Sequence, residues 1–197
     1  MKFIPSLIAA AAALALVPAA HAVSLQGGAV QTVAGNLVDD FSTDGLLSFD
    51  LGLQTLQPVT LNFVVGANDG GSLPFAALVS NFLGYNVQSL NISLGNGVTF
   101  DMLGTAIPAF NSATVGLLNG SEALVSVAGV GEGVHVELGN VFGDTPDATD
   151  WMLNLNGLQA GQSFSMTITT AVPEPSAIAM VLAGLGVAAG VARRRQA

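Results

Sequence analysis

Hydrophobic and polar positions alternate along most of the chain between residues 23 and 170. The most regular run is Ser163–Thr169, in which Ser or Thr alternates with Phe, Met and Ile. A period of two residues is typical of a half-buried β-strand, because successive side chains of a strand point to opposite faces. Besides 163–169, strands are predicted at 46–53, 59–65, 90–94, 98–102, 122–127, 134–138 and 151–155. A short helix is predicted only at 75–83.

Turn dipeptides separate these runs. Asn-Gly pairs occur at 96–97, 119–120 and 156–157, and Asn-Gly favours type I′ hairpin turns because both residues tolerate a positive φ angle. The clearest predicted hairpin joins 115–118 to 121–127. The spacing predicts eight or nine strands, whose apolar faces two packed antiparallel sheets would bury. We therefore predict that residues 23–170 form an all-β fold, an antiparallel β-sandwich. A jelly roll is one topology that fits this prediction.

Composition constrains the chemistry more than the fold. The chain of 197 residues is long enough for one domain, and it has 13 acidic and four basic residues and no cysteine. The basic residues are Lys2 and the run 193–195, so residues 23–172 contain none, whereas they hold every acidic residue except Glu174. Such a body is not expected to bind nucleic acid or an anionic lipid surface electrostatically. Disulfides, thiolate metal sites and a cysteine nucleophile are excluded.

The N-terminus has the pattern of a secretory signal peptide. Lys2 is followed by an apolar run up to Val17, and then by Pro18 and the small-x-small sequence Ala20-His21-Ala22. This order is typical of a leader that signal peptidase removes after passage through the secretion translocon. We predict residues 1–22 to be the signal peptide, with Ala20 and Ala22 at the cleavage site. A first transmembrane helix is the alternative.

The C-terminus combines a proline-containing linker, 171–176, an apolar segment, 177–192, and a basic tail, 193–197. About 17 apolar residues are just enough to cross a bilayer as a helix. Arginines that follow a membrane span favour the cytoplasmic side. The body would then lie outside that membrane, which agrees with the predicted leader.

These C-terminal residues resemble the PEP-CTERM sorting signal of Gram-negative bacteria that produce exopolysaccharide. The matching parts are the apolar segment, the motif Val172-Pro173-Glu174-Pro175-Ser176 and the cluster Arg193-Arg194-Arg195. The resemblance implies processing by an exosortase, a membrane-embedded cysteine transpeptidase-like enzyme that would recognise Pro-Glu-Pro and remove the helix and arginines. The body would be anchored transiently and then pass to the cell envelope or extracellular matrix. An ordinary membrane anchor with a proline-rich stalk is the alternative.

The body has a weaker resemblance to the FxDxF-type subgroup of PEP-CTERM proteins. The resemblance rests on residues 39–42, the aromatic strand 151–155, the Ala160-Gly161 turn and the strand 163–169, although Leu37 stands where the subgroup has its leading Phe. The subgroup implies no chemistry. The tail is also described as an ice-binding-protein C-terminal domain. Ice binding needs a periodic Thr array, and only Thr167–Thr170 approaches one, so we do not expect it.

Few residues could carry catalysis. Without the leader, His135 is the only histidine, at an outward position of the strand 134–138, so a catalytic triad and a multi-histidine metal site are excluded. The sequence has no G-x-S-x-G and no P-loop motif, and Gly129–Gly133 is interpreted as a turn. Paired carboxylates can hydrolyse glycosides, but one Trp, one Tyr and no Arg leave little to bind sugars. We expect no enzyme activity.

Acidic residues cluster in two predicted loops. Oxygen ligands in flexible loops suit Ca²⁺, which takes six to eight of them. The EF-hand spacing is absent, and Asp is also common in ordinary solvated turns, so both interpretations stay open. The candidate Ca²⁺ ligands are Asp39, Asp40, Asp44, Asp144, Asp147 and Asp150.

The sequence therefore predicts a secreted, exosortase-sorted protein of the envelope or extracellular matrix, with a non-enzymatic structural or interaction role linked to exopolysaccharide. A calcium-dependent carbohydrate-binding adhesin is the alternative, and a glycoside hydrolase is the third. Trp151 or Tyr85 beside carboxylates on a concave sheet face would favour the adhesin. A close, buried carboxylate pair in a cleft would favour the hydrolase.

Overall fold

The computed structural model describes residues 22–143 and 145–172, and within them every regular element is a β-strand. The all-β prediction is confirmed. The predicted signal peptide up to residue 21, and the apolar segment and basic tail at the C-terminus, lie outside the described residues. The described part of the chain has no helix of the length and hydrophobicity needed to cross a membrane.

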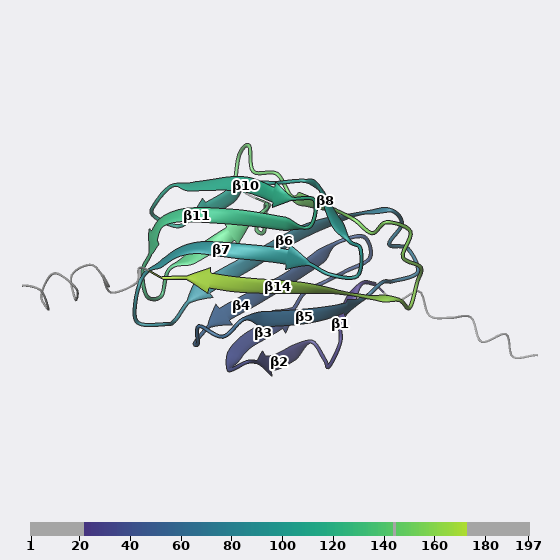
Figure 1. Cartoon of the computed structure of the whole chain (residues 1–197), viewed down its shortest axis with the longest axis horizontal. Helices are drawn as coiled ribbons and strands as arrows, with labels where there is room; N and C mark the ends of the chain where they lie inside the picture. The colour runs from purple at the N-terminus through teal and green to yellow at the C-terminus, as the bar shows by residue number, and fades with distance from the viewer. Residues whose placement is uncertain (1–21, 144, 173–197) are drawn as a thin grey trace, which may run out of the picture.

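The first sheet, sheet A, has six strands and is antiparallel throughout. Its central strands are β14 and β7, which lie side by side at the front of Figure 1. In spatial order the strands are β1 (Ser24–Leu25), β5 (Val59–Val64), β14 (Ser163–Ala171), β7 (Val87–Leu94), β11 (Glu122–Val130) and β10 (Ala113–Asn119).

The second sheet, sheet B, has eight strands and is mixed. Its two central strands, β4 and β6, run parallel, which corrects the prediction of purely antiparallel sheets. The path through the sheet is β2 (Val30–Val33), β3 (Asn36–Asp40), β4 (Leu47–Leu53), β6 (Ser72–Asn81), β12 (His135–Leu138) and β9 (Ala106–Pro108). The first half of β6 pairs instead with β13 (Trp151–Asn154), which pairs in turn with β8 (Thr99–Met102).

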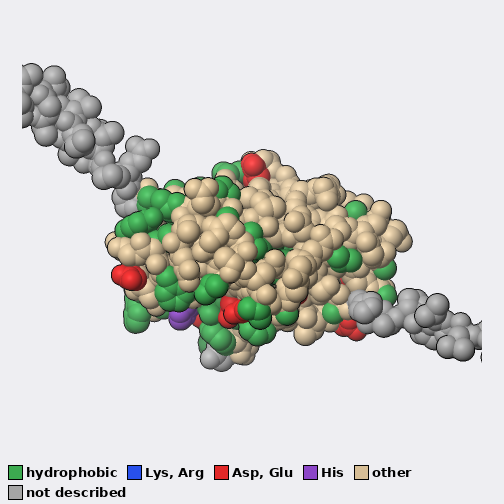
Figure 2. Space-filling model, turned by 90° about the horizontal axis from the view of Figure 1, so that it is seen from below, with side chains coloured by type: hydrophobic (Ala, Val, Ile, Leu, Met, Phe, Trp, Pro, Cys, Tyr) green, Lys and Arg blue, Asp and Glu red, His purple; other side chains and the backbone are tan. Residues whose placement is uncertain are grey.

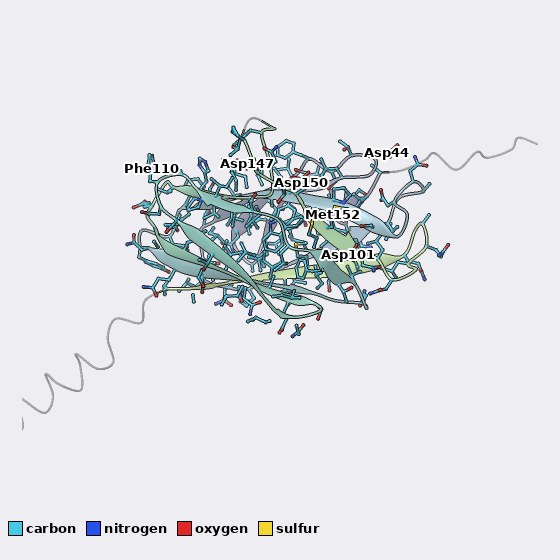
Figure 3. All side chains as sticks on the ribbon, turned by 90° about the horizontal axis from the view of Figure 1, so that it is seen from above. Asp44, Asp101, Phe110, Asp147, Asp150 and Met152 are labelled. Atoms are coloured by element: carbon cyan, nitrogen blue, oxygen red, sulfur yellow. The ribbon has the colours of Figure 1, made fainter. Side chains whose placement is uncertain are left out.

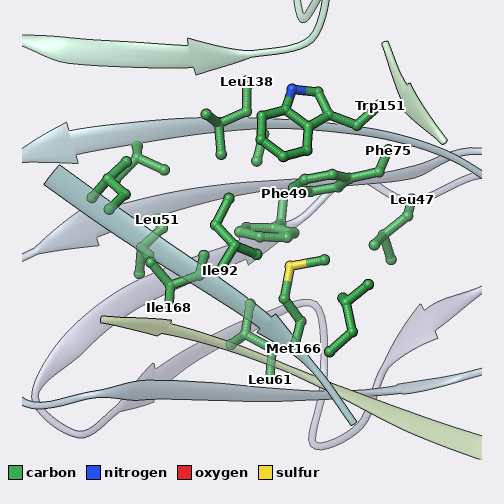
Figure 4. Close-up of a cluster of buried hydrophobic side chains, with 14 of the residues drawn as sticks. Leu47, Phe49, Leu51, Leu61, Phe75, Ile92, Leu138, Trp151, Met166 and Ile168 are labelled. Carbon is green, nitrogen blue, oxygen red and sulfur yellow. The ribbon is translucent and has the colours of Figure 1, made fainter. Parts of the chain in front are cut away.

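The two sheets pack face to face, and a row of aromatic rings joins them. The ring of Phe63 on β5 lies 5.9 Å from that of Phe49 on β4, and Phe49 lies 5.8 Å from Phe75 on β6. Trp151 continues the row on the far side of Phe75, 6.1 Å away and edge-on (Figure 4). Aromatic pairs at such separations add to the stability that burial of the rings provides.

The alternation seen in the sequence explains which face of each strand is buried. In β14, Phe164, Met166 and Ile168 are buried, whereas the intervening Ser and Thr are not. β4, β5 and β7 show the same alternation. The core thus forms between the sheets because each strand buries one of its two faces.

The predicted helix at 75–83 is wrong, because most of this segment belongs to β6. Phe75, Ala77 and Val79 point into the core, and Ala76 on the other face is also buried, since Gly139 lies against it. The outward positions Pro74, Ala76 and Leu78 are apolar as well, so this stretch reads as a continuous apolar run without alternation. The sequence signal of a strand is therefore absent in β6, although the neighbouring β4 shows it.

The predicted strand count is too low, since the described residues contain fourteen strands. Several of them, such as β1 and β9, have only two or three residues. A strand of that length is too short to show a period of two, so its pairing with neighbours, rather than its pattern, defines it.

Candidate functional site

The outer face of sheet A carries many hydroxyl and amide side chains, and apolar residues such as Val64, Leu124 and Ala128 lie among them. The hydroxyl and amide side chains occupy positions that alternate with the inward-facing residues of five neighbouring strands, so they point away from the core. We call this set the hydroxyl face: Thr60, Asn62, Ser89, Asn91, Ser93, Thr114, Ser126, Ser165, Thr167 and Thr169.

The strand register aligns these side chains in rows across the sheet. Thr60, Thr167 and Ser93 are direct neighbours on β5, β14 and β7, and the hydroxyl oxygens of Thr60 and Thr167 lie 2.9 Å apart in a hydrogen bond. Thr169 and Asn91 form the next row. Neighbouring strands are about 4.8 Å apart, so the rows present hydrogen-bonding groups at short, regular intervals.

The hydroxyl face is also nearly uncharged. Glu122, at the start of β11, is the only acidic residue in the six strands of sheet A. The acidic residues of the body lie instead on sheet B and in the loops. This face can therefore donate and accept many hydrogen bonds but offers almost no electrostatic attraction to a charged ligand.

Sequence inspection missed this face. Along the chain only Thr167–Thr170 suggests an array, whereas the structure assembles its members from segments as far apart as Thr60 and Thr169. The signal was present as the polar half of each alternating run. The order of strands that brings those halves together cannot be derived from that pattern.

The outer face of sheet B carries acidic residues in a row. Asp39 on β3 lies opposite Asp50 on β4, and the row continues through Leu78 on β6 to Glu137 on β12. Partial burial, and after it the negative charge of Asp39, raise the pKa of Asp50 above its ordinary value of 3.8. His135 lies outward on β12, as predicted, with its Nε2 atom 3.8 Å from Oε1 of Glu137.

Three of the predicted calcium ligands, Asp40, Asp44 and Asp150, accept hydrogen bonds from nearby loops. Both carboxylate oxygens of Asp40 accept from backbone N–H groups, those of Leu25 at 2.8 Å and Ser42 at 3.0 Å. Oδ1 of Asp150 accepts from the backbone N–H of Asn140 at 2.8 Å. Asp44 accepts a side-chain hydrogen bond from Asn68 at 3.1 Å.

The two acidic clusters are separate in space. Figure 3 shows Asp147 and Asp150 over the middle of the molecule and Asp44 toward one end. The described residues contain no group of three or more His, Asp or Glu side chains arranged to hold a metal ion. Asp144 lies outside the described residues, so the calcium site stays a prediction.

Trp151 does not provide a platform for sugars. Its side chain is fully buried, its indole N–H donates to the backbone oxygen of Thr105 at 2.9 Å, and the rings of Phe75 and Phe100 pack against it. Tyr85 is exposed in the loop between β6 and β7. The arrangement that would favour the adhesin is therefore not formed by Trp151.

The described chain ends where the predicted sorting motif begins. Strand β14 ends at Ala171, and Val172 follows it directly. The other predicted sorting residues, Pro173 to Ser176 and Arg193 to Arg195, lie outside the described residues, as does Ala20 of the predicted cleavage site.

Fold and sequence together define an all-β body joined through a central strand of sheet A to a C-terminal sorting segment. A family model described as the PEP-CTERM protein-sorting motif matches residues 171–196. The chain therefore carries a PEP-CTERM sorting signal at its C-terminal end. The motif indicates an exported protein that is anchored at its C-terminus and then processed by an exosortase. Neither a curated protein nor a solved structure matches the chain significantly.

Proposed function

We propose that the body is a non-enzymatic structural or interaction protein that associates with extracellular polysaccharide through the hydroxyl face of sheet A. The observation that supports this function is the neutral array of Ser, Thr and Asn side chains across five strands. Polysaccharide chains expose many hydroxyl groups that both donate and accept hydrogen bonds, as this array does.

The association is expected to be weak for each sugar and to gain strength from repetition. A neutral hydrogen bond that replaces one to water contributes only about 0.5–1.5 kcal/mol. The hydroxyl face has no aromatic ring on which a sugar could stack. A long polymer can engage several rows at once, however, and release from all of them together is slow.

Asn91 near the centre of the hydroxyl face adds a further acceptor. Its Oδ1 atom is buried and accepts no hydrogen bond within the described part of the chain. Buried acceptors are normally paired, and an unpaired one destabilises the protein. A small rotation of this amide would offer the oxygen to a sugar hydroxyl, so polysaccharide binding would satisfy a group that the free protein leaves unused.

Binding of the processed protein to purified exopolysaccharide of the native host tests this function. Replacing Thr60 and Thr167 together by Val keeps the side-chain shape and strand propensity but removes two adjacent hydroxyl groups. We expect severalfold weaker binding. Thr32→Val, on the exposed edge strand β2, is the matched control and should bind as the unaltered protein does. Equal binding by all three proteins, or binding by none, would contradict the proposal.

A further inference from the structure

The end of the molecule at which β14 terminates carries four loops. Because β14 runs antiparallel to β5 and β7, it ends beside the points where those strands begin, with Ile168 opposite Val59 and Ala171 opposite Ser89. β11 ends and β10 begins at the same end of sheet A. We call this the anchor-side end; its loops are 54–58, 82–86, 109–112 and 131–134.

Large hydrophobic side chains are exposed in three of these loops. They are 41–83% exposed, and Phe110 is the most exposed of them. Figure 2 shows the molecule from below, with hydrophobic side chains gathered toward the left end of the visible surface. This is the end at which β14 terminates in Figure 1. The set, which we call the anchor-side patch, consists of Leu56, Phe82, Tyr85 and Phe110.

Two buried asparagines hold these loops in place. Oδ1 of Asn36 accepts from the backbone N–H groups of Gln54 and Thr55, at 2.7 and 2.8 Å, in the loop that carries Leu56. Asn81 donates to the backbone oxygens of Tyr85 and Val130, at 2.8 and 2.7 Å. Both asparagines are about 1% exposed or less. The exposure of Leu56, Phe82 and Tyr85 is therefore built into the fold, because their two loops are tied to buried polar groups.

Charge is sparse at this end. Glu132 is the only acidic residue in the four loops, and no Lys or Arg occurs between residues 23 and 172. The other described acidic residues lie on the strands of sheet B, at the start of β11 or in loops other than these four. Such a surface does not attract anionic phosphate groups, but it can enter an interface whose headgroups carry no net charge, where aromatic side chains are favoured.

The short linker after Val172 keeps the anchor-side end close to the membrane that holds the C-terminal anchor. Only residues 173–176 separate Val172 from the apolar segment that begins at Ala177. Five residue steps span at most about 18 Å even when fully extended. While the C-terminal segment anchors the protein, the anchor-side end must therefore lie within the reach of the lipid headgroups.

We propose that the anchor-side patch inserts into the lipid–water interface of the membrane that holds the C-terminal anchor. The insertion orients the body with β14 pointing toward the bilayer. It also places the Pro-Glu-Pro motif at the membrane surface, where a membrane-embedded processing enzyme can reach it. The contact depends on the anchor and ends when the tail is removed, and it is independent of the polysaccharide proposal.

Tryptophan quenching in the full-length chain tests this insertion. Phe110→Trp places a reporter in the patch, while the native Trp151 is fully buried and gives a constant background. The protein is reconstituted at one chain per disc into phosphatidylcholine nanodiscs that contain brominated lipid, which quenches nearby indole fluorescence. We expect severalfold stronger quenching of Phe110→Trp than of the control Phe41→Trp. Phe41 is also exposed, at 57% against 83% for Phe110, and it follows the end of β3 that lies away from the patch.

The outcomes separate the alternative occupants of the patch. Equal quenching of the two reporters overturns the proposal. A blue-shifted but unquenched Phe110→Trp also overturns it, because the tail of the chain would then cover the patch; single-chain discs exclude a second copy. Tyr85→Trp repeats the test if Phe110→Trp loses the near-ultraviolet dichroism of the native fold. Replacing part of the phosphatidylcholine by anionic phosphatidylglycerol should weaken the quenching, since the acidic body is repelled.

Discussion

Three polar residues are buried in the described part of the chain, and each of them holds a loop by accepting hydrogen bonds from backbone N–H groups. Asn36 and Asn81 do so at the anchor-side end, and Asp69 accepts from Gly66 at 2.6 Å and Gly45 at 3.1 Å. Buried polar groups are tolerated only when they are paired, and here the partners are loop amides. The sequence contained no sign of the two asparagines, because an Asn at the end of a strand has no local pattern that marks it as buried.

Asp50 predicts a pH dependence of stability. Because its pKa is raised above 3.8, the folded state binds this proton more tightly than the unfolded chain does. Its stabilising contribution is fully present below pH 3.8 and is lost as the pH rises through the raised pKa. Asp50→Asn should therefore raise Tm at pH 7, and the difference should shrink toward zero as the pH falls below that range. Since the Asp50 carboxylate keeps partial contact with water, the increase in the free energy of unfolding should stay below about 1 kcal/mol, which corresponds to a few degrees in Tm.

Asp101→Asn is the matched control, because Asp101 is exposed on β8 of the same sheet. Thermal unfolding of the three proteins from pH 3 to pH 7 checks this prediction. A lower Tm for Asp50→Asn at pH 7, or the same rise for Asp101→Asn, would contradict the prediction, because burial and the charge of Asp39 would then not disfavour the charged form of Asp50.

At the scale of elements, two Asn-Gly turns connect the sheets. Asn96 and Gly97 have φ angles of 56° and 79°, and Asn156 and Gly157 have 49° and 81°, as type I′ turns require. The first turn leads from β7 in sheet A to β8 in sheet B, and the second leads from β13 in sheet B to β14 in sheet A. They are therefore crossings between layers and not the predicted hairpin turns. The side chain of Asn156 donates to the backbone oxygen of Gly97, which joins the two turns.

The third Asn-Gly pair, at 119–120, lies between two adjacent strands of one sheet, so the predicted hairpin between β10 and β11 is confirmed. Asn119 belongs to β10, however, and pairs with Glu122, so that Gly120 and Ser121 form the turn. A register shift between Leu117 and Asn119 moves the turn by one residue. Oδ1 of Asn119 accepts from the backbone N–H of Ser121 at 2.9 Å. The Asn-Gly dipeptide thus has positive φ angles in the two turns between the sheets but not in the hairpin. Side-chain hydrogen bonds and strand register decide which conformation it adopts.

Gly97→Ala and Gly157→Ala should each lower the free energy of unfolding by about 1–2 kcal/mol, because a Cβ atom is unfavourable at positive φ. Gly116→Ala is the control: Gly116 lies in β10, its φ is not positive, and no atom lies within 4 Å of the position that a Cβ atom would take. We expect it to be neutral or slightly stabilising. Urea denaturation measures all three, and an equal loss for Gly116→Ala would contradict the assignment of strain to the turns.

Strands were predictable from the sequence where one face is buried and the other meets water, as in β14 and β7. β6 was not, because its outward positions hold Pro74, Ala76 and Leu78 where an alternating strand has polar residues. Pairing between distant segments was not predictable either, so the sequence did not indicate the hydroxyl face, although most of its residues lie at outward positions of predicted strands. Ser89 and Thr114 lie outside the predicted strands, because β7 and β10 begin earlier than expected. The sorting signal was predictable, since its parts lie in one short segment of the chain, and the family model matches residues 171–196.

For the whole molecule, the positions of the two ends of the body agree with its sorting. Ser24 on β1 lies opposite Val64, which also faces Ser163 at the start of β14, so the described chain begins and ends at opposite ends of sheet A (Figure 1). Val23, the predicted first residue of the mature chain, is fully buried in the core. The folded body thus begins where cleavage of the leader is predicted and ends where the sorting motif starts.

Intact-mass measurement of the protein isolated from the exopolysaccharide fraction of its native host tests the account most directly. We predict a chain that begins at Val23, ends within or near the Pro-Glu-Pro motif, and lacks the apolar segment and Arg193–Arg195. A full-length chain found only in the membrane fraction, with its C-terminal arginines intact, would contradict the account.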